Sequence, residues 1–393
     1  MRILAITQKL PSPAHDGYNL RTAAYLPRLA ARHEVALASL ERGSIDERLE
    51  RKLAHVLRLP DRAPPHASAL WRALTVFSPD ELHDLNPQVD RELERFVAEF
   101  RPDVVWSVGW RMLPHALALR SVPIAADAVD EAVREAWLEL RSGPTPRRLV
   151  HLVRVLRFER RYFPAAARVL FVSDQDARVT EKVAPGSRCA VTPNGVDVDH
   201  YAPAPGPITP DLLVFEGALV HPPNVQAVRY FVSEVLPAIR ARRPAARLLV
   251  VGRDPPPELL ELSRPDPAAA GVEFTGFVDD VRPYVRGASV FVSPLIGGAG
   301  LKNKVLQAWA MGKAVVATPM SIGGLNARDG EELIVARDAE ELASACLKLL
   351  GDPALREKLG AAGRRAAVER FSWDIATARL EGELARAVAD SRK

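Results

Sequence analysis

The chain has little cysteine, and what it has is widely spaced. Cys189 and Cys346 are the only two cysteines among 393 residues, and neither has a His or Cys nearby at a spacing that suits metal ligands. These absences exclude a disulfide framework and a zinc module. They fit a protein of the reducing cytoplasm.

Long apolar runs and a strong charge of one sign are also absent. No window approaches the ~18 uncharged apolar residues that a membrane-spanning helix requires. The apolar start at Met1–Ile6 turns polar at Thr7, which is too short for a signal peptide and fits a buried first strand. The 53 Lys and Arg against 49 Asp and Glu leave a net charge of +4, too weak an excess to indicate nucleic-acid binding.

What is present is an alternation of short aliphatic runs with amphipathic segments of helical length, which predicts two parallel sheets covered on both faces. The expected strands of the first half are Arg2–Thr7, Glu34–Ser39, Val104–Val108, Ile124–Asp127, Val169–Ser173 and Cys189–Thr192. Those of the second half are Leu212–Glu216, Arg247–Gly252, Val272–Thr275, Val290–Pro294, Ala314–Thr318 and Glu332–Val335. Closely spaced prolines near residue 200 indicate a linker.

The predicted organisation is therefore two Rossmann-like domains facing one another across a cleft. Residues 1–195 form the first domain, 196–210 the linker and 211–371 the second domain. Helices are expected at Ala339–Leu350, Pro353–Arg370 and Ser372–Ala389, with Ser372 as an N-cap. The last segment, 372–393, is long enough to cross back onto the first domain.

The most informative segment runs from Ser293 to Lys313, where a buried strand leads into a glycine-rich turn and a helix begins near Leu301. Small residues allow close approach of a ligand, and the free N–H groups at a helix start attract phosphate. Lys302 and Lys304 in the first turn oppose the helix dipole, which indicates an anion between them. The alternative is an ordinary turn with solvated lysines.

Four ordered motifs resemble family 4 retaining glycosyltransferases of the GT-B fold. They are Gly297 to Thr318, Pro193-Asn194-Gly195-Val196-Asp197, Val250-Val251-Gly252-Arg253 and Phe274-Thr275-Gly276-Phe277-Val278-Asp279. Within that family the chain is most similar to sugar transferases associated with exopolysaccharide synthesis. The resemblance covers essentially the whole chain and is strongest from about Val191 to Arg370.

The resemblance implies a nucleoside-diphosphate sugar bound mainly by the second domain. The diphosphate would be held by the glycine turn and its lysines, with Lys302 also counted as catalytic because positive charge stabilises the leaving group. The implied donor-binding residues are Gly17, Gly217, His221, Arg253, Phe277, Val278, Gly298, Ala299, Gly300, Leu301, Lys302, Asn303, Lys304 and Gln307. A plain turn remains the alternative for Phe277 and Val278, and a structural role for His221.

The chain departs from the family pattern at two places. The family's pair of glutamates falls on Ala299 and Gln307, which retains hydrogen bonding to a ribose but puts the donor-sugar contact in doubt. The Arg and Lys that many relatives place after the first strand of the second domain are also missing, since Glu216 to Asn224 contains only His221 as a potential cation.

In the first domain, the loop before the first helix contains Gly17, and Asn19 and Arg21 are expected on the acceptor side. Asp127 and Asp130 follow the fourth expected strand and are candidates to orient an acceptor hydroxyl or to take its proton. Their alternative role is to cap the helix that begins near Val129. For the loop at Gly17 the alternative is a solvated turn.

A basic helical region follows, with aliphatic residues between the charges. Its members are Trp137, Arg147, Arg148, Leu149, Leu152, Val153, Arg154, Leu156, Arg157, Arg160 and Arg161. Such a pattern suits an anionic membrane surface, where lipid-linked acceptors reside, and equally suits a helix with one packed and one solvated face.

The sequence thus predicts a cytoplasmic glycosyltransferase, with a weak peripheral contact to the inner face of the membrane left open. It moves a sugar from a nucleotide donor to a glycan, lipid-linked or small-molecule hydroxyl, with retention. No metal or other cofactor is expected, because lysines and backbone N–H groups would hold the phosphates and no Asp-x-Asp stands at a strand end. Nucleic acid is not expected as a partner, because the excess of positive charge is too small. The alternatives are a nucleotide-sugar epimerase of the same fold and a catalytically silent sugar-nucleotide-binding subunit. A dinucleotide oxidoreductase is disfavoured by the absence of Gly-x-Gly-x-x-Gly after either first strand.

Overall fold

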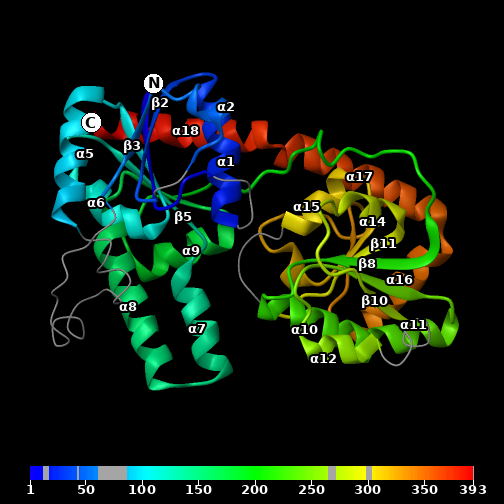
Figure 1. The fold of residues 1–393 in the computed structure, drawn as a ribbon. Helices are drawn as coiled ribbons and strands as arrows, with labels where there is room; N and C mark the ends of the chain where they lie inside the picture. Colours follow the sequence, from blue (N-terminus) through cyan, green and yellow to red (C-terminus); the bar gives the residue numbers. More distant parts are fainter. Residues whose placement is uncertain (12–16, 42–43, 61–85, 264–270, 298–302, 393) are drawn as a thin grey trace. The chain divides into compact units, whose positions relative to one another are not determined.

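The computed structural model describes residues 1–11, 17–41, 44–60, 86–263, 271–297 and 303–392. These residues form two compact units (Figure 1). Unit 1 comprises Met1–Pro193 together with Ala376–Lys393, and unit 2 comprises Asn194–Ile375. In each unit the described residues form one parallel β-sheet with helices packed against it.

Unit 1 contains a seven-stranded sheet in the order β3-β2-β1-β4-β5-β6-β7. Its strands are β1 (Arg2–Thr7), β2 (Glu34–Ser39), β3 (His55–Arg58), β4 (Val104–Val108), β5 (Ile124–Val129), β6 (Arg168–Phe171) and β7 (Cys189–Val191). The chain runs outward from β1 in one direction and then restarts at β4 in the other. The strand order therefore reverses between β1 and β4, which is where open parallel sheets place their ligands.

Unit 1 also contains helices, some of which pack on the sheet through an apolar stripe. They are α1 (Gly17–Ala30), α2 (Glu47–Glu50), α5 (Pro87–Phe100), α6 (Leu113–Ala118), α7 (Ala132–Ser142), α8 (Pro146–Tyr162) and α9 (Asp174–Val183). In α5, for example, Val89, Leu93, Val97 and Phe100 recur at helical spacing and are all buried. Asn86 caps this helix by accepting a hydrogen bond from the backbone N–H of Gln88 (2.9 Å).

Unit 2 repeats the plan with a six-stranded sheet in the order β10-β9-β8-β11-β12-β13. Its strands are β8 (Thr209–Glu216), β9 (Arg247–Val251), β10 (Val272–Phe274), β11 (Ala288–Ser293), β12 (Val315–Ala317) and β13 (Ile334–Val335). Its helices are α10 (Pro222–Tyr230), α11 (Leu236–Arg242), α12 (Pro257–Leu260), α14 (Arg282–Gly287), α15 (Asn303–Ala310), α16 (Ala339–Gly351) and α17 (Pro353–Phe371). Here the order reverses between β8 and β11.

The last helix, α18 (Trp373–Ser391), begins in unit 2 and belongs to unit 1 from Ala376 onward. Ser372 caps it, as predicted, by accepting a hydrogen bond from the N–H of Ile375 (3.4 Å). Within unit 1 the helix is held by ion pairs, among them Arg32 to Glu381 (3.0 Å) and Arg168 to Asp390 (2.7 Å).

The parallel-sheet architecture predicted from the sequence is confirmed, and all twelve expected strands are present within a few residues of their predicted bounds. The described residues contain one further strand, β3, at the edge of the first sheet beside β2. Its four residues, His55 to Arg58, are exposed at both ends, so it lacks the continuous aliphatic run that marks a buried strand. None of the described helices is both long and apolar enough to span a bilayer.

Candidate functional site

The site in unit 2 is built where its strand order reverses, at the carboxyl ends of β8 and β11. After β8 the backbone turns through Gly217, whose N–H donates to the carbonyl of Val251 at the end of β9 (2.9 Å). A Cβ on Gly252 would clash with the carbonyl oxygen of Gly217, so the two strand ends can approach only because residue 252 is glycine.

Lys304, in the first turn of α15, reaches this turn. Its Nζ donates a hydrogen bond to Oδ1 of Asn224 in α10 (2.7 Å) and lies 4.4 Å from the centroid of the Phe215 ring. A Cβ on Gly217 would lie 2.7 Å from the same Nζ, which is too close for a non-bonded contact. Glycine at position 217 therefore leaves room for the ammonium group. A cation is therefore fixed beside the β8 turn by groups from α10 and from the end of β8.

A carboxyl group stands next to this cation. Burial raises the pKa of Glu216, the last residue of β8, and the positive charge of Lys304 opposes that rise. Asn224 completes the arrangement, because its Nδ2 donates to the carbonyl of Ala218 (2.8 Å) and so fixes the side chain that holds Lys304.

Two further predicted residues of α15 bond to the segment that follows residue 193. Nε2 of Gln307 donates to the hydroxyl of Tyr201 (2.9 Å), and Nδ2 of Asn194 donates to Oδ1 of Asn303 (3.3 Å). Burial raises the pKa of Tyr201 to about 12, and the negative charge of Glu216 adds to the rise. Tyr201, Asn224 and Glu216 were missed as site residues, because sequence spacing does not reveal which side chains the fold brings to α15.

The other predicted donor residues of unit 2 lie at the surface or outside the described residues. Phe277 is 70% exposed. Arg253 is partly exposed with Nε 3.8 Å from Asp254, and Val278 is half-buried. His221 is exposed just before α10 and makes no side-chain capping bond. Gly298, Ala299, Gly300, Leu301 and Lys302 lie outside the described residues.

In unit 1, the structure uses Arg21 and Asp127 differently from the prediction. Nη2 of Arg21 lies 2.8 Å from Oδ2 of Asp127, and both side chains are completely buried. The guanidinium also donates to the carbonyl oxygen (2.8 Å) and hydroxyl (3.0 Å) of Thr192, and Trp106 Nε1 donates to Asp127 (3.2 Å). This enclosed ion pair holds β5 and the segment after β7 to α1, and both charged groups are shielded from solvent.

The predicted helix caps near residue 129 also need correction. Glu131, and not Asp127 or Asp130, caps α7 by accepting from the N–H groups of Val133 (3.0 Å) and Arg134 (2.5 Å). Asp130 is exposed, beside Val129. Val129 has a φ of 67°, a left-handed conformation that strains a β-branched residue. Such strain persists at functional positions, so the carboxyl end of β5 with Asp130 remains a candidate. Gly17 begins α1, and the backbone carbonyl of Asn19 accepts from Thr22 (3.2 Å).

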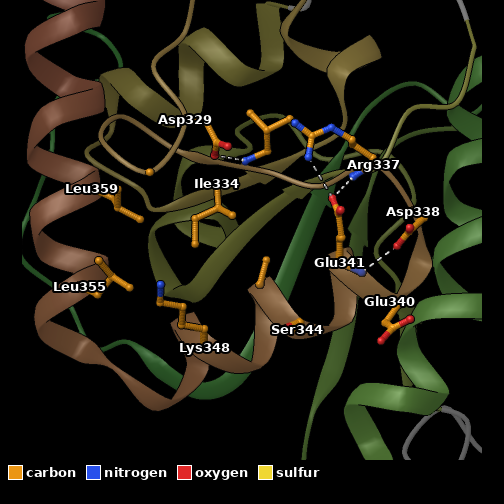
Figure 2. A pocket seen from close by; sticks show the side chains of 13 residues that line it. Asp329, Ile334, Arg337, Asp338, Glu340, Glu341, Ser344, Lys348, Leu355 and Leu359 are labelled. Atoms are coloured by element: carbon orange, nitrogen blue, oxygen red, sulfur yellow. Dashed lines mark hydrogen bonds and ion pairs between the residues drawn. The ribbon is translucent and has the colours of Figure 1, made fainter.

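A hollow of about 710 Å³ lies elsewhere in unit 2, beside the edge strand β13 and between α16 and α17 (Figure 2). It contains none of the predicted donor residues. Two of its carboxylates serve the local backbone, since Glu341 accepts from the N–H of Arg337 (2.8 Å) and Asp338 caps α16 through the N–H of Glu341 (2.8 Å). It is therefore separate from the site at β8 and β11.

A pair of carboxyl groups at the base of α7 and α8 makes stability depend on pH. Glu159 of α8 is 2% exposed, and burial raises its pKa to about 9, with the charge of Glu131 adding to the rise. In the unfolded chain a glutamate titrates near 4.5. Between these two pH values the folded protein keeps a proton that the unfolded chain has lost, so stability falls as pH rises.

We therefore expect Glu159→Gln to flatten the decline in the free energy of unfolding between pH 5 and 9 and to be more stable than the unsubstituted protein at pH 8. A single group contributes a slope of at most about 1.4 kcal/mol per pH unit. Urea unfolding at pH 5, 6, 7 and 8 measures it. Glu139→Gln, on the exposed side of α7, is the matched control and keeps the original slope. Parallel curves for Glu159→Gln and the unsubstituted protein would refute the assignment.

The chain matches two glycosyltransferase family models, one in each half. A family model described as a glycosyl transferase 4-like domain matches residues 16–195, and one described as glycosyl transferases group 1 matches residues 210–352. The chain is 32% identical over 212 residues to the phosphatidyl-myo-inositol mannosyltransferase of Mycobacterium leprae, covering 52% of this chain and 55% of that protein. It is 32% identical over 140 residues to the lipopolysaccharide core biosynthesis glycosyltransferase LpsE of Rhizobium meliloti, covering 35% and 41%. The chain thus spans about half the length of the curated relatives it matches.

Two solved structures have the same fold over nearly the whole chain. HepE of Anabaena in complex with UDP has a TM-score of 0.73 at 16% identity and covers 98% of this chain and 100% of its own. The sucrose-phosphate synthase of Thermosynechococcus elongatus has a TM-score of 0.72 at 19% identity and covers 100% of both chains. At these identities the likeness establishes the fold alone.

Proposed function

Because the chain belongs to the GT4-type glycosyltransferases of the GT-B fold, we propose that it transfers a sugar from a nucleoside-diphosphate donor to an acceptor hydroxyl. The observation that carries the proposal is Lys304, held beside the β8 turn by Asn224 and Phe215 at the point where the strand order reverses. A diphosphate there would meet a cation and the closely approaching backbone of Gly217.

The chemistry that Lys304 would perform is the stabilisation of the leaving group. When the bond between the sugar and the diphosphate breaks, negative charge grows on the diphosphate, and a cation already held in position lowers the energy of that state. The ammonium group needs no rearrangement, because Asn224 orients it before the donor arrives. Glu216 beside it would add a negative charge if ionised, and its raised pKa reduces that repulsion.

The relatives support a nucleotide donor and a glycoconjugate acceptor. A protein of the same fold, HepE, has been solved with UDP and with UDP-glucose, and two curated relatives are named for phosphatidylinositol and for the lipopolysaccharide core. We extend these assignments to this chain as a nucleoside-diphosphate sugar and a hydroxyl on a glycan or lipid-linked acceptor. Retention of the anomeric configuration, catalysis without a metal and a cytoplasmic location belong to the same proposal.

The test is a screen of the purified full chain against UDP-, GDP-, ADP- and dTDP-sugars, with and without phosphatidylinositol or a polysaccharide acceptor, in buffer containing EDTA. Mass spectrometry is expected to detect release of the nucleoside diphosphate from one donor and transfer of its sugar. Nuclear magnetic resonance of the product gives the anomeric configuration.

Other outcomes of the same screen would replace the proposal. An epimerised donor without transfer would identify an epimerase. Binding of a nucleotide, seen as a thermal shift, without turnover of any donor would identify a silent binding subunit. Activity that appears only after a divalent metal is added would overturn the metal-independent part of the proposal.

A further inference from the structure

The helices α7 and α8 form a hairpin that extends away from the sheet of unit 1 (Figure 1). Among the described residues of this unit, the large apolar side chains that are exposed gather on this hairpin, with Met1 as the exception. They are Trp137 (49% exposed), Leu138 (40%), Leu149 (52%), Val150 (47%) and Val153 (40%). A concentration of this kind on one element marks an interaction surface.

The outer face of α8 contains no acidic residue. At 100° per residue, one side of the helix carries the half-buried or buried residues Leu152, Val155 and Glu159. The opposite side consists of proline, aliphatic and arginine residues alone: Pro146, Arg147, Leu149, Val150, Val153, Arg154, Arg157, Arg160 and Arg161. The aliphatic members lie in the first half of the helix, and most of the arginines follow them. We call this set the outer face of α8.

Neighbouring carboxylates leave most of the positive charge of the hairpin unpaired, although Arg134 of α7 forms an ion pair with Asp176 (3.7 Å). Residues 132–162 contain eight arginines against three glutamates, an excess larger than the +4 of the whole chain. One of the glutamates, Glu159, is buried, and its raised pKa favours the neutral form. Within the described residues, Arg147, Arg154 and Arg157 form no ion pair. Their guanidinium groups are available to bind anions.

We propose that the outer face of α8 binds the surface of an anionic lipid bilayer. Leu149, Val150 and Val153 would enter the boundary between headgroups and acyl chains, where their exposed apolar surface leaves water. The arginines around them would pair with lipid phosphates, for which the planar guanidinium group is well suited. A helix of 17 residues is about 25 Å long and can lie flat in that interface. This proposal stands independently of the transfer reaction.

The mixture of residues favours a bilayer over a nucleic acid. A nucleic-acid surface combines cations with aromatic residues on which bases stack, whereas the outer face of α8 has three aliphatic residues and no aromatic one. Exposed Leu and Val gain nothing from a phosphate backbone, but they gain free energy when a lipid interface covers them. Trp137, exposed on α7 of the same hairpin, is of the type enriched at membrane interfaces.

The experiment is co-sedimentation of the full chain with vesicles of phosphatidylcholine alone and with vesicles containing 30% phosphatidylglycerol. We expect binding to the anionic vesicles only, weakened by 0.5 M salt because surface charges are screened. Arg154→Glu/Arg157→Glu and Leu149→Ser/Val153→Ser are each expected to lower the vesicle partition coefficient at least tenfold. Thermal unfolding and UDP binding, measured in parallel, show whether each variant remains folded.

The matched control carries the same change of charge elsewhere. Lys348→Glu/Lys358→Glu alters two exposed lysines of α16 and α17 in unit 2 and should bind vesicles like the unsubstituted chain. The proposal is overturned if hairpin and control variants lose binding equally, or if neutral vesicles bind as well as anionic ones. It is also overturned if the full chain ignores vesicles and binds a single-stranded oligonucleotide or polyglutamate through Arg154 and Arg157.

Discussion

Replacing Asp127 with alanine is expected to lower the free energy of unfolding of unit 1 by about 3–5 kcal/mol, because it leaves the Arg21 guanidinium buried without its anion. Both side chains are completely buried, and the neutral groups around Arg21, among them the oxygens of Thr192 and the ring of Tyr25, would not replace the lost negative charge. Trp106 Nε1 would lose its acceptor as well. Urea unfolding followed by tryptophan fluorescence measures the loss.

The double variant Arg21→Met/Asp127→Leu distinguishes two causes of lost stability, namely the burial of an unpaired charge and the loss of the ion pair itself. Removing both charges together should recover part of the stability that the single change at Asp127 costs, whereas independent residues would give additive losses. Glu47→Ala is the matched control, since it breaks the ion pair to Arg51 (3.1 Å) on the exposed helix α2. That change should cost at most about 1 kcal/mol. If Asp127→Ala abolished sugar transfer but left stability intact, the carboxylate would be catalytic after all.

Replacing Lys304 with methionine is expected to weaken UDP binding by about 10- to 100-fold. A hydrogen bond to a charged group contributes about 1.5–3 kcal/mol, and Lys304 is the cation placed at the β8 turn among the described residues. Methionine keeps much of the side-chain length and its packing on Phe215. Isothermal titration calorimetry with UDP gives the affinity, and thermal unfolding checks that the fold is retained.

Lys348→Met provides the matched control for Lys304. It removes the same charge from the same unit at an exposed position in the hollow between α16 and α17, where no donor residue was predicted (Figure 2). The affinity for UDP should therefore stay within twofold of the original. Equal UDP affinities for Lys304→Met and the unsubstituted protein would rule out the diphosphate site at β8 and would remove the main support for the proposed transferase.

Several features of this protein follow from local patterns in the sequence. The buried parallel strands appear as aliphatic runs because both faces of each sheet are covered, and Ser372 is recognisable as a cap from its position before a helical pattern. The glycines at 217 and 252 and the lysine at 304 can also be recognised from the local sequence around them. Their placement at one edge of one sheet follows from the rule that parallel strands end on the same side.

Only the tertiary structure decided which side chains meet. Arg21 and Asp127 are 106 positions apart, and so are Tyr201 and Gln307, and no spacing rule predicts that they form an ion pair and a hydrogen bond. A charged residue after a strand looks the same in the sequence whether it faces a ligand or is paired in the interior. The sequence therefore determined the buried strands, the cap at Ser372 and the chemical groups available at the sheet edges. Packing decided which of those groups are enclosed, as for Arg21, and which remain to bind, because burial depends on contacts between segments far apart in the chain.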